Sequence, residues 1–302
     1  MNRDEFINEL SKAVQDKIRV CYGLEADTSV ITVDKNNIKA TELSVRFPGE
    51  NIVPAVRIDN FYEDFRAGID IDIMAESITE QVFNAYRNAP ELPRLTPDEA
   101  KRHITLTLMN TEHNREYLTN VPHFDICGGE LSAIPRWLVS PEASFVVNND
   151  LARSLNLTPD EVLQIGQSNI NAQEFKAISM SALLTEMTGQ EFEDGAQMIV
   201  LTSEDRIQGS KAMLSEKALN MVHDRLGDFT ILPSSIHEVI CIPAGGDPEE
   251  LRAMVKEINE TQVSPEERLS DNIFSYDGMK LSILSDAHKI EPEITNSITM
   301  SM

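Results

Sequence analysis

The spacing of apolar residues predicts that the first 90 residues form a helix, three strands and two further helices. In residues 71–88, apolar side chains recur every three or four positions, which is the period of a helix with one buried face. Between 29 and 58, three β-branched segments are separated by the turn sequences Asp34-Lys-Asn-Asn37 and Pro48-Gly-Glu-Asn51. The expected elements are a helix at 3–20, strands at 29–33, 40–47 and 52–58, and helices at 60–67 and 71–88.

The remaining chain predicts a less regular middle and then a β-β-α-β-β-α order. A strong two-residue turn signal, Asp277-Gly278, predicts a closing hairpin. In the middle we expect strands at 103–109, 133–139 and 143–147, and helices at 111–119, 150–155, 160–168 and 174–187. After it we expect strands at 197–202, 209–214, 229–233, 238–242, 273–276 and 280–284, and helices at 215–226 and 248–260.

Four helix starts are written directly into the sequence. Each has a capping side chain, then proline at the first helical position and glutamate at the third. The four begin at Thr96, Thr158, Asp247 and Ser264. We expect all four to start helices or helical turns.

Two prolines in Ala89-Pro-Glu-Leu-Pro93 interrupt the pattern and mark a boundary. We predict an N-terminal αβββαα domain at 1–93, a C-terminal α+β domain at 94–290 and a tail at 291–302. The fold class is α+β, with mixed, mostly antiparallel sheets, packed helices and two subdomains. The segment between the domains is too short for a free linker, so we expect them to be coupled.

Composition narrows the functional classes. The 302 residues carry 50 Asp and Glu against 26 Lys and Arg, a net charge of −24, which disfavours direct nucleic-acid binding. No secretory signal and no apolar run long enough to span a bilayer is visible. The three cysteines Cys21, Cys127 and Cys241 are far apart, and we expect reduced thiols. We therefore expect a cytoplasmic protein without a membrane association.

The best constellation of possible metal ligands is His123, Asp125 and Cys127. Their two-residue spacing would point all three to one face of an extended chain. Imidazole, carboxylate and thiolate are all zinc ligands, but same-face neighbours lie roughly 7 Å apart in a strand, so a bend at Gly128 would be needed. The alternative is a strand edge that enters a Gly-Gly turn.

A second candidate lies in the Pro233-Ser-Ser235 corner and the His237-Glu238 pair that follows. Position 241 is Cys241, so the pair does not extend to a metallopeptidase HExxH. We expect the hydroxyls of the corner to bond backbone groups. We also expect the corner to join two neighbouring strands, whose core residues are covered by the 248–260 helix. The expected contributors are Ile236, Val239 or Ile240, and Ile242 from the strands, and Leu251, Val255 and Ile258 from the helix.

The run from Phe229 to Pro243, followed by Asp247-Pro-Glu-Glu, resembles a family from anaerobic Gram-positive bacteria that is known as a domain of unknown function. The resemblance covers most of the chain. It implies a shared αβ architecture and no particular chemistry.

Three functional hypotheses follow. The first is a non-catalytic, acidic interaction or regulatory protein with a protein partner, motivated by the charge and by the lack of a complete catalytic motif. The second is a metal-dependent hydrolase that uses His123, Asp125 and Cys127. The third is small-ligand binding between the domains. No cofactor is predicted.

Overall fold

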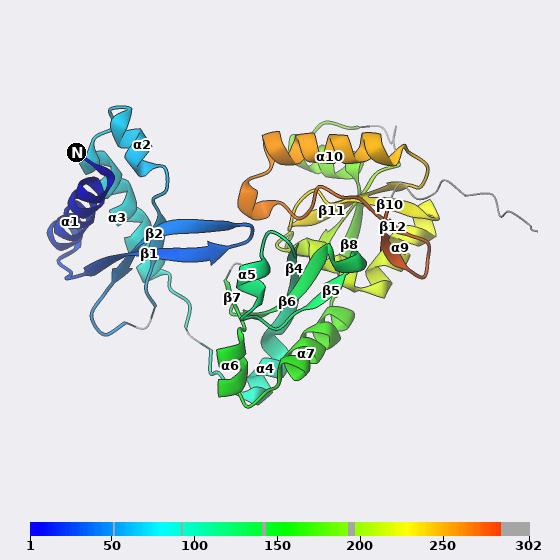
Figure 1. The fold of residues 1–302 in the computed structure, drawn as a ribbon, viewed down its shortest axis with the longest axis horizontal. Coiled ribbons are helices and arrows are strands. Elements are labelled where there is room, and N and C mark those ends of the chain that lie inside the picture. Colours follow the sequence, from blue (N-terminus) through cyan, green and yellow to red (C-terminus); the bar gives the residue numbers. More distant parts are fainter. Residues whose placement is uncertain (51, 92, 141–142, 193–196, 285–302) are drawn as a thin grey trace, which may run out of the picture.

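The computed structural model describes residues 1–50, 52–91, 93–140, 143–192 and 197–284, and it has two lobes (Figure 1). The described residues combine helices with antiparallel sheets, so the predicted α+β class is confirmed. Among the described residues, every strand pair is antiparallel. No helix in these ranges is long and apolar enough to cross a membrane.

The N-terminal lobe has the predicted order of one helix, three strands and two helices. Apolar residues on α1 and α3 pack against one face of a three-stranded sheet, in the order β1-β2-β3, and form a hydrophobic core of their own. Phe6 and Leu10 of α1 and Ile78 of α3 are fully buried there. The elements are α1 (Arg3–Tyr22), β1 (Asp27–Lys35), β2 (Ile38–Arg46), β3 (Ala55–Arg57), α2 (Phe61–Arg66) and α3 (Ile71–Arg87).

The C-terminal lobe contains two more sheets. One has the order β4-β6-β5, with β7 paired to β6, and the other has the order β13-β12-β10-β11-β9-β8. The strands are β4 (Ile104–Asn110), β5 (Phe124–Ile126), β6 (Leu131–Leu138), β7 (Ser144–Val146), β8 (Phe175–Ser179), β9 (Ile199–Ser203), β10 (Phe229–Leu232), β11 (Glu238–Pro243), β12 (Phe274–Tyr276) and β13 (Leu281–Ile283). The helices are α4 (Pro97–His103), α5 (Arg115–Leu118), α6 (Asn149–Ser154), α7 (Pro159–Ala172), α8 (Met180–Thr188), α9 (Glu216–Leu226) and α10 (Pro248–Gln262), with 3-10 turns η1 (Cys127–Gly129), η2 (Gly209–Leu214) and η3 (Pro265–Glu267).

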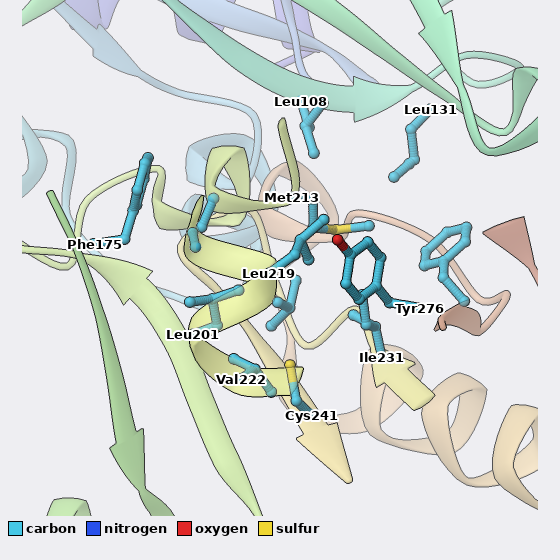
Figure 2. Close-up of a cluster of buried hydrophobic side chains, with 14 of the residues drawn as sticks. Leu108, Leu131, Phe175, Leu201, Met213, Leu219, Val222, Ile231, Cys241 and Tyr276 are labelled. Carbon is cyan, nitrogen blue, oxygen red and sulfur yellow. The ribbon is translucent and has the colours of Figure 1, made fainter. Parts of the chain in front are cut away.

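The largest core lies between these two sheets. Figure 2 shows Leu108 and Leu131 of the smaller sheet above a cluster that includes Leu201, Ile231 and Cys241 of the larger one. Met213 of η2 and Leu219 and Val222 of α9 also belong to the cluster. The C-terminal lobe therefore has a core of its own, separate from that of the N-terminal lobe.

The Pro233-Ser-Ser235 corner joins β10 and β11, as predicted, and these strands pair directly. Along β11 the side chains alternate between two cores. Val239 and Cys241 enter the large core, whereas Ile240 and Ile242 pack with Leu251 and Val255 of α10. Two expectations were wrong: Ile236 packs against the large core, and Ile258 of α10 is 42% exposed.

The helix starts read from the sequence are all present. Thr96, Thr158 and Asp247 each accept a hydrogen bond from the first turn of α4, α7 and α10, and Ser264 precedes η3. The Thr158 backbone nitrogen also donates to the Glu161 carboxylate, which completes a capping box. Local sequence alone therefore fixes these four boundaries.

Two predicted elements were wrong. Residues 174–187 were expected to form one helix, but β8 ends at Ser179, whose side chain caps α8, because β8 pairs with β9 along the edge of the larger sheet. Residues 209–214 were expected to form a strand and instead form η2. A Cβ on Gly209 would lie 2.4 Å from the His237 carbonyl oxygen and 2.5 Å from the Ser203 nitrogen, so the chain turns where only glycine fits. The predicted tail, 291–302, lies outside the described residues.

Candidate functional site

The β1–β2 hairpin is the feature of this molecule that is best suited to contact another molecule. β1 pairs with β2 over all nine of its residues, from Asp27 opposite Arg46 to Lys35 opposite Ile38. β2 lies between β1 and β3, so β1 is the edge of the sheet. In Figure 1 the hairpin extends from the N-terminal lobe toward the C-terminal lobe. The hairpin therefore presents one complete strand edge.

The ladder fixes which backbone groups of β1 point outward. On β2, the Val45 nitrogen donates to Pro54 and the Thr41 carbonyl accepts from Ile58, so both residues direct their backbone groups toward the β3 side. In an antiparallel pair the residues opposite them then direct theirs away from β2. By the register, Thr28, Val30, Thr32 and Asp34 present N–H and C=O groups at the free edge. Within the described chain, no backbone hydrogen bond uses these groups.

The side chains of this edge are unprotected. Exposed edges in proteins are commonly blocked by proline, by inward-facing lysine or by a bulge. The Val30-Ile-Thr-Val33 centre of β1 has no proline and no charge, and the ladder has no bulge. Val30 is 40% exposed and Ile31 is 39% exposed, and they lie on opposite faces of the sheet. β1 therefore combines unpaired backbone groups with accessible apolar side chains on both faces.

The tip of the hairpin is held by the C-terminal lobe. The Asn36 amide donates to the carbonyl oxygens of Glu266 (2.9 Å) and Arg268 (3.1 Å). The Asn37 amide donates to Pro265 (3.0 Å) and also to Arg268 (2.7 Å). We call these contacts, with the Asn114 bonds described next, the hairpin latch.

Asn114 holds the other side of the tip. Its side-chain oxygen accepts from the Asn37 backbone nitrogen at 2.8 Å, and its amide nitrogen lies 3.1 Å from the Asn36 Oδ1 and 2.9 Å from the Asn37 Oδ1. The same nitrogen lies 2.8 Å from the Asn110 carbonyl oxygen. Asn114 is only 4% exposed, so these bonds are shielded from water and strengthened by their surroundings.

Two ion pairs flank the latch. Lys39 Nζ lies 2.9 Å from Glu116 Oε2, and this hydrogen bond raises the pKa of Lys39. Arg57 lies 2.8 Å from Glu266 Oε1 and 2.6 Å from Asp59 Oδ2. Beside the second pair is a cleft of about 450 Å³ between the lobes, lined by Arg57, Asp59, Asn60, Phe61 and Ser264–Glu266. The junction therefore has a hydrogen-bonded centre beside an open cleft.

The three predicted metal ligands lie in different environments. His123 Nδ1 donates to the Val121 carbonyl at 2.8 Å, Asp125 accepts from the Ser132 hydroxyl at 2.7 Å, and both residues are exposed. Cys127 is buried, because β5 ends at Ile126 and Cys127 begins a turn with φ 51°. Burial, and then the nearby Glu130, raise the pKa of its thiol to about 12.

The strand alternation that would align the three side chains thus stops before Cys127. Within the described ranges, no three His, Cys, Asp or Glu side chains are grouped to hold a metal. The hydrolase hypothesis stays a prediction, which metal analysis of protein purified without chelator would test.

The second candidate is the corner before β11, where side chains form hydrogen bonds with backbone groups. The Ser235 hydroxyl accepts from the His237 nitrogen at 3.0 Å, as expected for a turn hydroxyl. His237 Nδ1 accepts from the Gln208 nitrogen at 3.3 Å, which leaves Nε2 to face Glu267 at 3.6 Å. The His237 carbonyl accepts from Gly209 and from Thr202. His237 therefore organises the turn before η2.

The comparison with known families decides the chain's relationship. Residues 3–278 match a family of unknown function, DUF5688, so the match spans both lobes. The chain belongs to this family. The curated proteins and the solved structures gave no match. The DUF5688 match thus assigns the chain to a family but does not assign an activity.

The sequence of this DUF5688 chain did not predict that the titratable residue Lys211 is buried. Lys211 of η2 is 3% exposed, and burial lowers its pKa, while the charge of Asp205 acts in the opposite direction. The neighbouring Ser210 hydroxyl is fully buried without a hydrogen-bond partner in the described part of the chain. The expected strand would have placed alternate residues at the surface, and only the turn at Gly209 could have indicated that Lys211 lies inside.

Proposed function

We propose that this protein is a non-catalytic interaction protein that binds another polypeptide by adding a strand to β1. The observation that carries the proposal is the open edge of β1, where four residues direct N–H and C=O groups away from the sheet. Strand addition obtains affinity from main-chain hydrogen bonds and specificity from alternate side chains. Val30 and Ile31 supply apolar contacts on the two faces.

The hairpin latch supports the proposal because it holds the edge in place before a partner arrives. A preformed site loses less conformational entropy on binding than a mobile one. Asn36 and Asn37 anchor one end of the hairpin, and the core of the N-terminal lobe anchors the other. A cytoplasmic location is part of this proposal, and the free thiols of Cys21, Cys127 and Cys241 support it.

The test compares partners recovered from the native host by the wild type and by Thr32→Pro. Proline is tolerated at an edge position whose N–H faces outward, and there it removes one edge donor. Ile73→Lys is the control, because Ile73 is an exposed apolar residue on α3, away from the edge. We expect Ile73→Lys to retain a reproducible partner and Thr32→Pro to lose it at an unchanged melting temperature. Equal recovery by all three proteins would remove β1 as the binding site.

A second candidate function is small-ligand binding at the junction, favoured by the cleft of about 450 Å³ beside Arg57. Phe61 offers an apolar surface there, beside the charged side chains of Arg57 and Asp59. A thermal-shift screen of nucleotides and metabolites tests it. A stabilising compound should lose its effect in Phe61→Ala and keep it in Thr32→Pro.

A further inference from the structure

We infer that the partner that β1 fits is β1 of a second copy of this chain, in an antiparallel pair with a twofold axis at Ile31. This inference rests on the proposed function and names its partner. The two three-stranded sheets would then join edge to edge into one continuous sheet. The sequence of β1, its ladder with β2 and the exposure of its side chains all favour this pair.

Along β1, residues alternate between directing their backbone groups toward β2 and toward the free edge, and this alternation allows the register. An antiparallel pair forms its bonds between residues that both direct their backbone groups outward. With the axis at Ile31, Thr28 faces Asp34 of the second copy and Val30 faces Thr32, and all four residues are outward-directed. The remaining residues meet in the closer, non-hydrogen-bonded pairs. The free edge can therefore be satisfied along its whole length.

The side chains are self-complementary in the same register. Ile31 faces Ile31 of the second copy, so two half-exposed apolar side chains cover each other. At both ends Asp27 faces Lys35, which gives two cross-strand pairs of opposite charge. Lys35 Nζ already lies 3.0 Å from Glu42 Oε1 and would sit between two carboxylates.

Neighbouring registers lack these features. When the axis moves by one residue, to Val30 or to Thr32, outward-directed residues still face each other but the strand ends are left unpaired. With the axis at Thr32, Val30 faces the carboxylate of Asp34 and Lys35 faces Ser29. With the axis at Val30, Lys35 lies beyond the end of the second strand. Only the axis at Ile31 pairs all nine residues and both sets of opposite charges.

The first experiment measures the mass of the full chain by sedimentation or light scattering between about 1 and 500 µM, the range expected for a small interface. We expect a dimer that dissociates on dilution. Ile31→Lys places two ammonium groups at the axis, and Thr32→Pro removes one edge donor from each of the two Val30–Thr32 pairs. Each should weaken dimerisation by at least about tenfold. Ile73→Lys, which adds the same charge on α3, should leave it unchanged.

The second experiment tests the register by disulfide formation in a Cys21→Ser background, which removes the exposed native thiol. In a non-hydrogen-bonded pair the two Cα atoms at position 31 lie about 4.5 Å apart, within disulfide range. Ile31→Cys should therefore cross-link two chains on mild oxidation. Val33→Cys is the control, since its two copies would be about 13 Å apart along the strands.

The outcomes separate this inference from the proposed function. A chain that stays monomeric throughout the concentration range, without a cross-link in Ile31→Cys, overturns the second copy as partner. If a host protein is then still lost specifically in Thr32→Pro, strand addition to β1 stands. A dimer that persists in both Ile31→Lys and Thr32→Pro uses another surface and also overturns the inference. Cross-linking of Val33→Cys instead of Ile31→Cys overturns the register.

Discussion

The side-chain nitrogen of Asn37 lies 2.7 Å from the carbonyl oxygen of Arg268, which is 231 residues further along the chain. This contact joins the tip of a hairpin in one lobe to a loop in the other. Asn37 also has a left-handed backbone, with φ 64°, so one residue supplies both the turn and the contact. The two roles can be separated by mutation.

Asn37→Gly should open the junction while it preserves the hairpin. Glycine accepts the left-handed backbone but lacks the amide that bonds Pro265 and Arg268. The Asn37 side-chain oxygen also accepts from Asn114, so at about 0.5–1.5 kcal/mol for each of the three lost hydrogen bonds, docking should weaken by about 1.5–4.5 kcal/mol. Hydrogen exchange should rise at the tip and in Pro265–Glu267. Asn88→Gly, at the exposed end of α3, is the control, and equal exchange in both variants would contradict the latch.

The three thiols should differ sharply in reactivity. Cys21 is exposed, whereas Cys127 and Cys241 are buried and burial raises the pKa of both thiols. Because the thiolate is the reactive form, a thiol reagent at pH 8 should modify one cysteine rapidly in the native protein and all three after unfolding. Cys21→Ser should abolish the fast phase. Rapid native modification of Cys127 would show that the β5 turn is open, and would support its predicted role as a metal ligand.

The sequence predicted those parts of the fold that local signals determine. Proline and glutamate after Thr158 fix the start of α7, and apolar periodicity fixes α3. It could not predict η2, because Gly209 reflects a close approach to Ser203 and His237 that exists only after folding. The open edge of β1 was equally hidden. Residues 29–33 were predicted as a strand, but a strand's position in a sheet depends on its partners, which periodicity does not name.

Lys211 should make stability depend on pH. Burial lowers its pKa in the folded state below the ordinary value of 10.5, so the unfolded chain binds more protons between the two values. The free energy of unfolding therefore rises with pH between the folded and the unfolded pKa of Lys211. Below the folded pKa, the full cost of burying the charged ammonium is present. Lys211→Met removes the buried ammonium.

Lys211→Met should consequently be more stable than the wild type at pH 7. The difference between their free energies of unfolding should narrow toward pH 10.5. Urea unfolding at several pH values measures it. Lys217→Met, an exposed lysine of α9 paired with Glu174, is the matched control and should show no such narrowing. A constant difference for Lys211→Met across the range would mean that the ammonium is not desolvated.

Helix α10 covers one face of the larger sheet. Val255 is 6% exposed and packs with Leu232 and Ile273, whereas Ile258 on the same helix is 42% exposed. Burying a valine contributes about 1.5–3 kcal/mol, and a buried carboxylate adds a desolvation cost. Val255→Asp should therefore unfold or severely destabilise the C-terminal lobe, while Ile258→Asp should cost less than about 1 kcal/mol. Thermal unfolding measures both.

Ser234→Ala provides a second comparison, in the corner between β10 and β11. The Ser235 hydroxyl bonds the turn, so loss of the Ser234 hydroxyl should change stability by less than about 1 kcal/mol. If Ser234→Ala left the melting temperature unchanged but abolished a measured activity, the corner would have a chemical role and the non-catalytic proposal would fail. If Ile258→Asp were as damaging as Val255→Asp, the exposed side of α10 would itself be covered in solution, and a second contact surface would have to lie there.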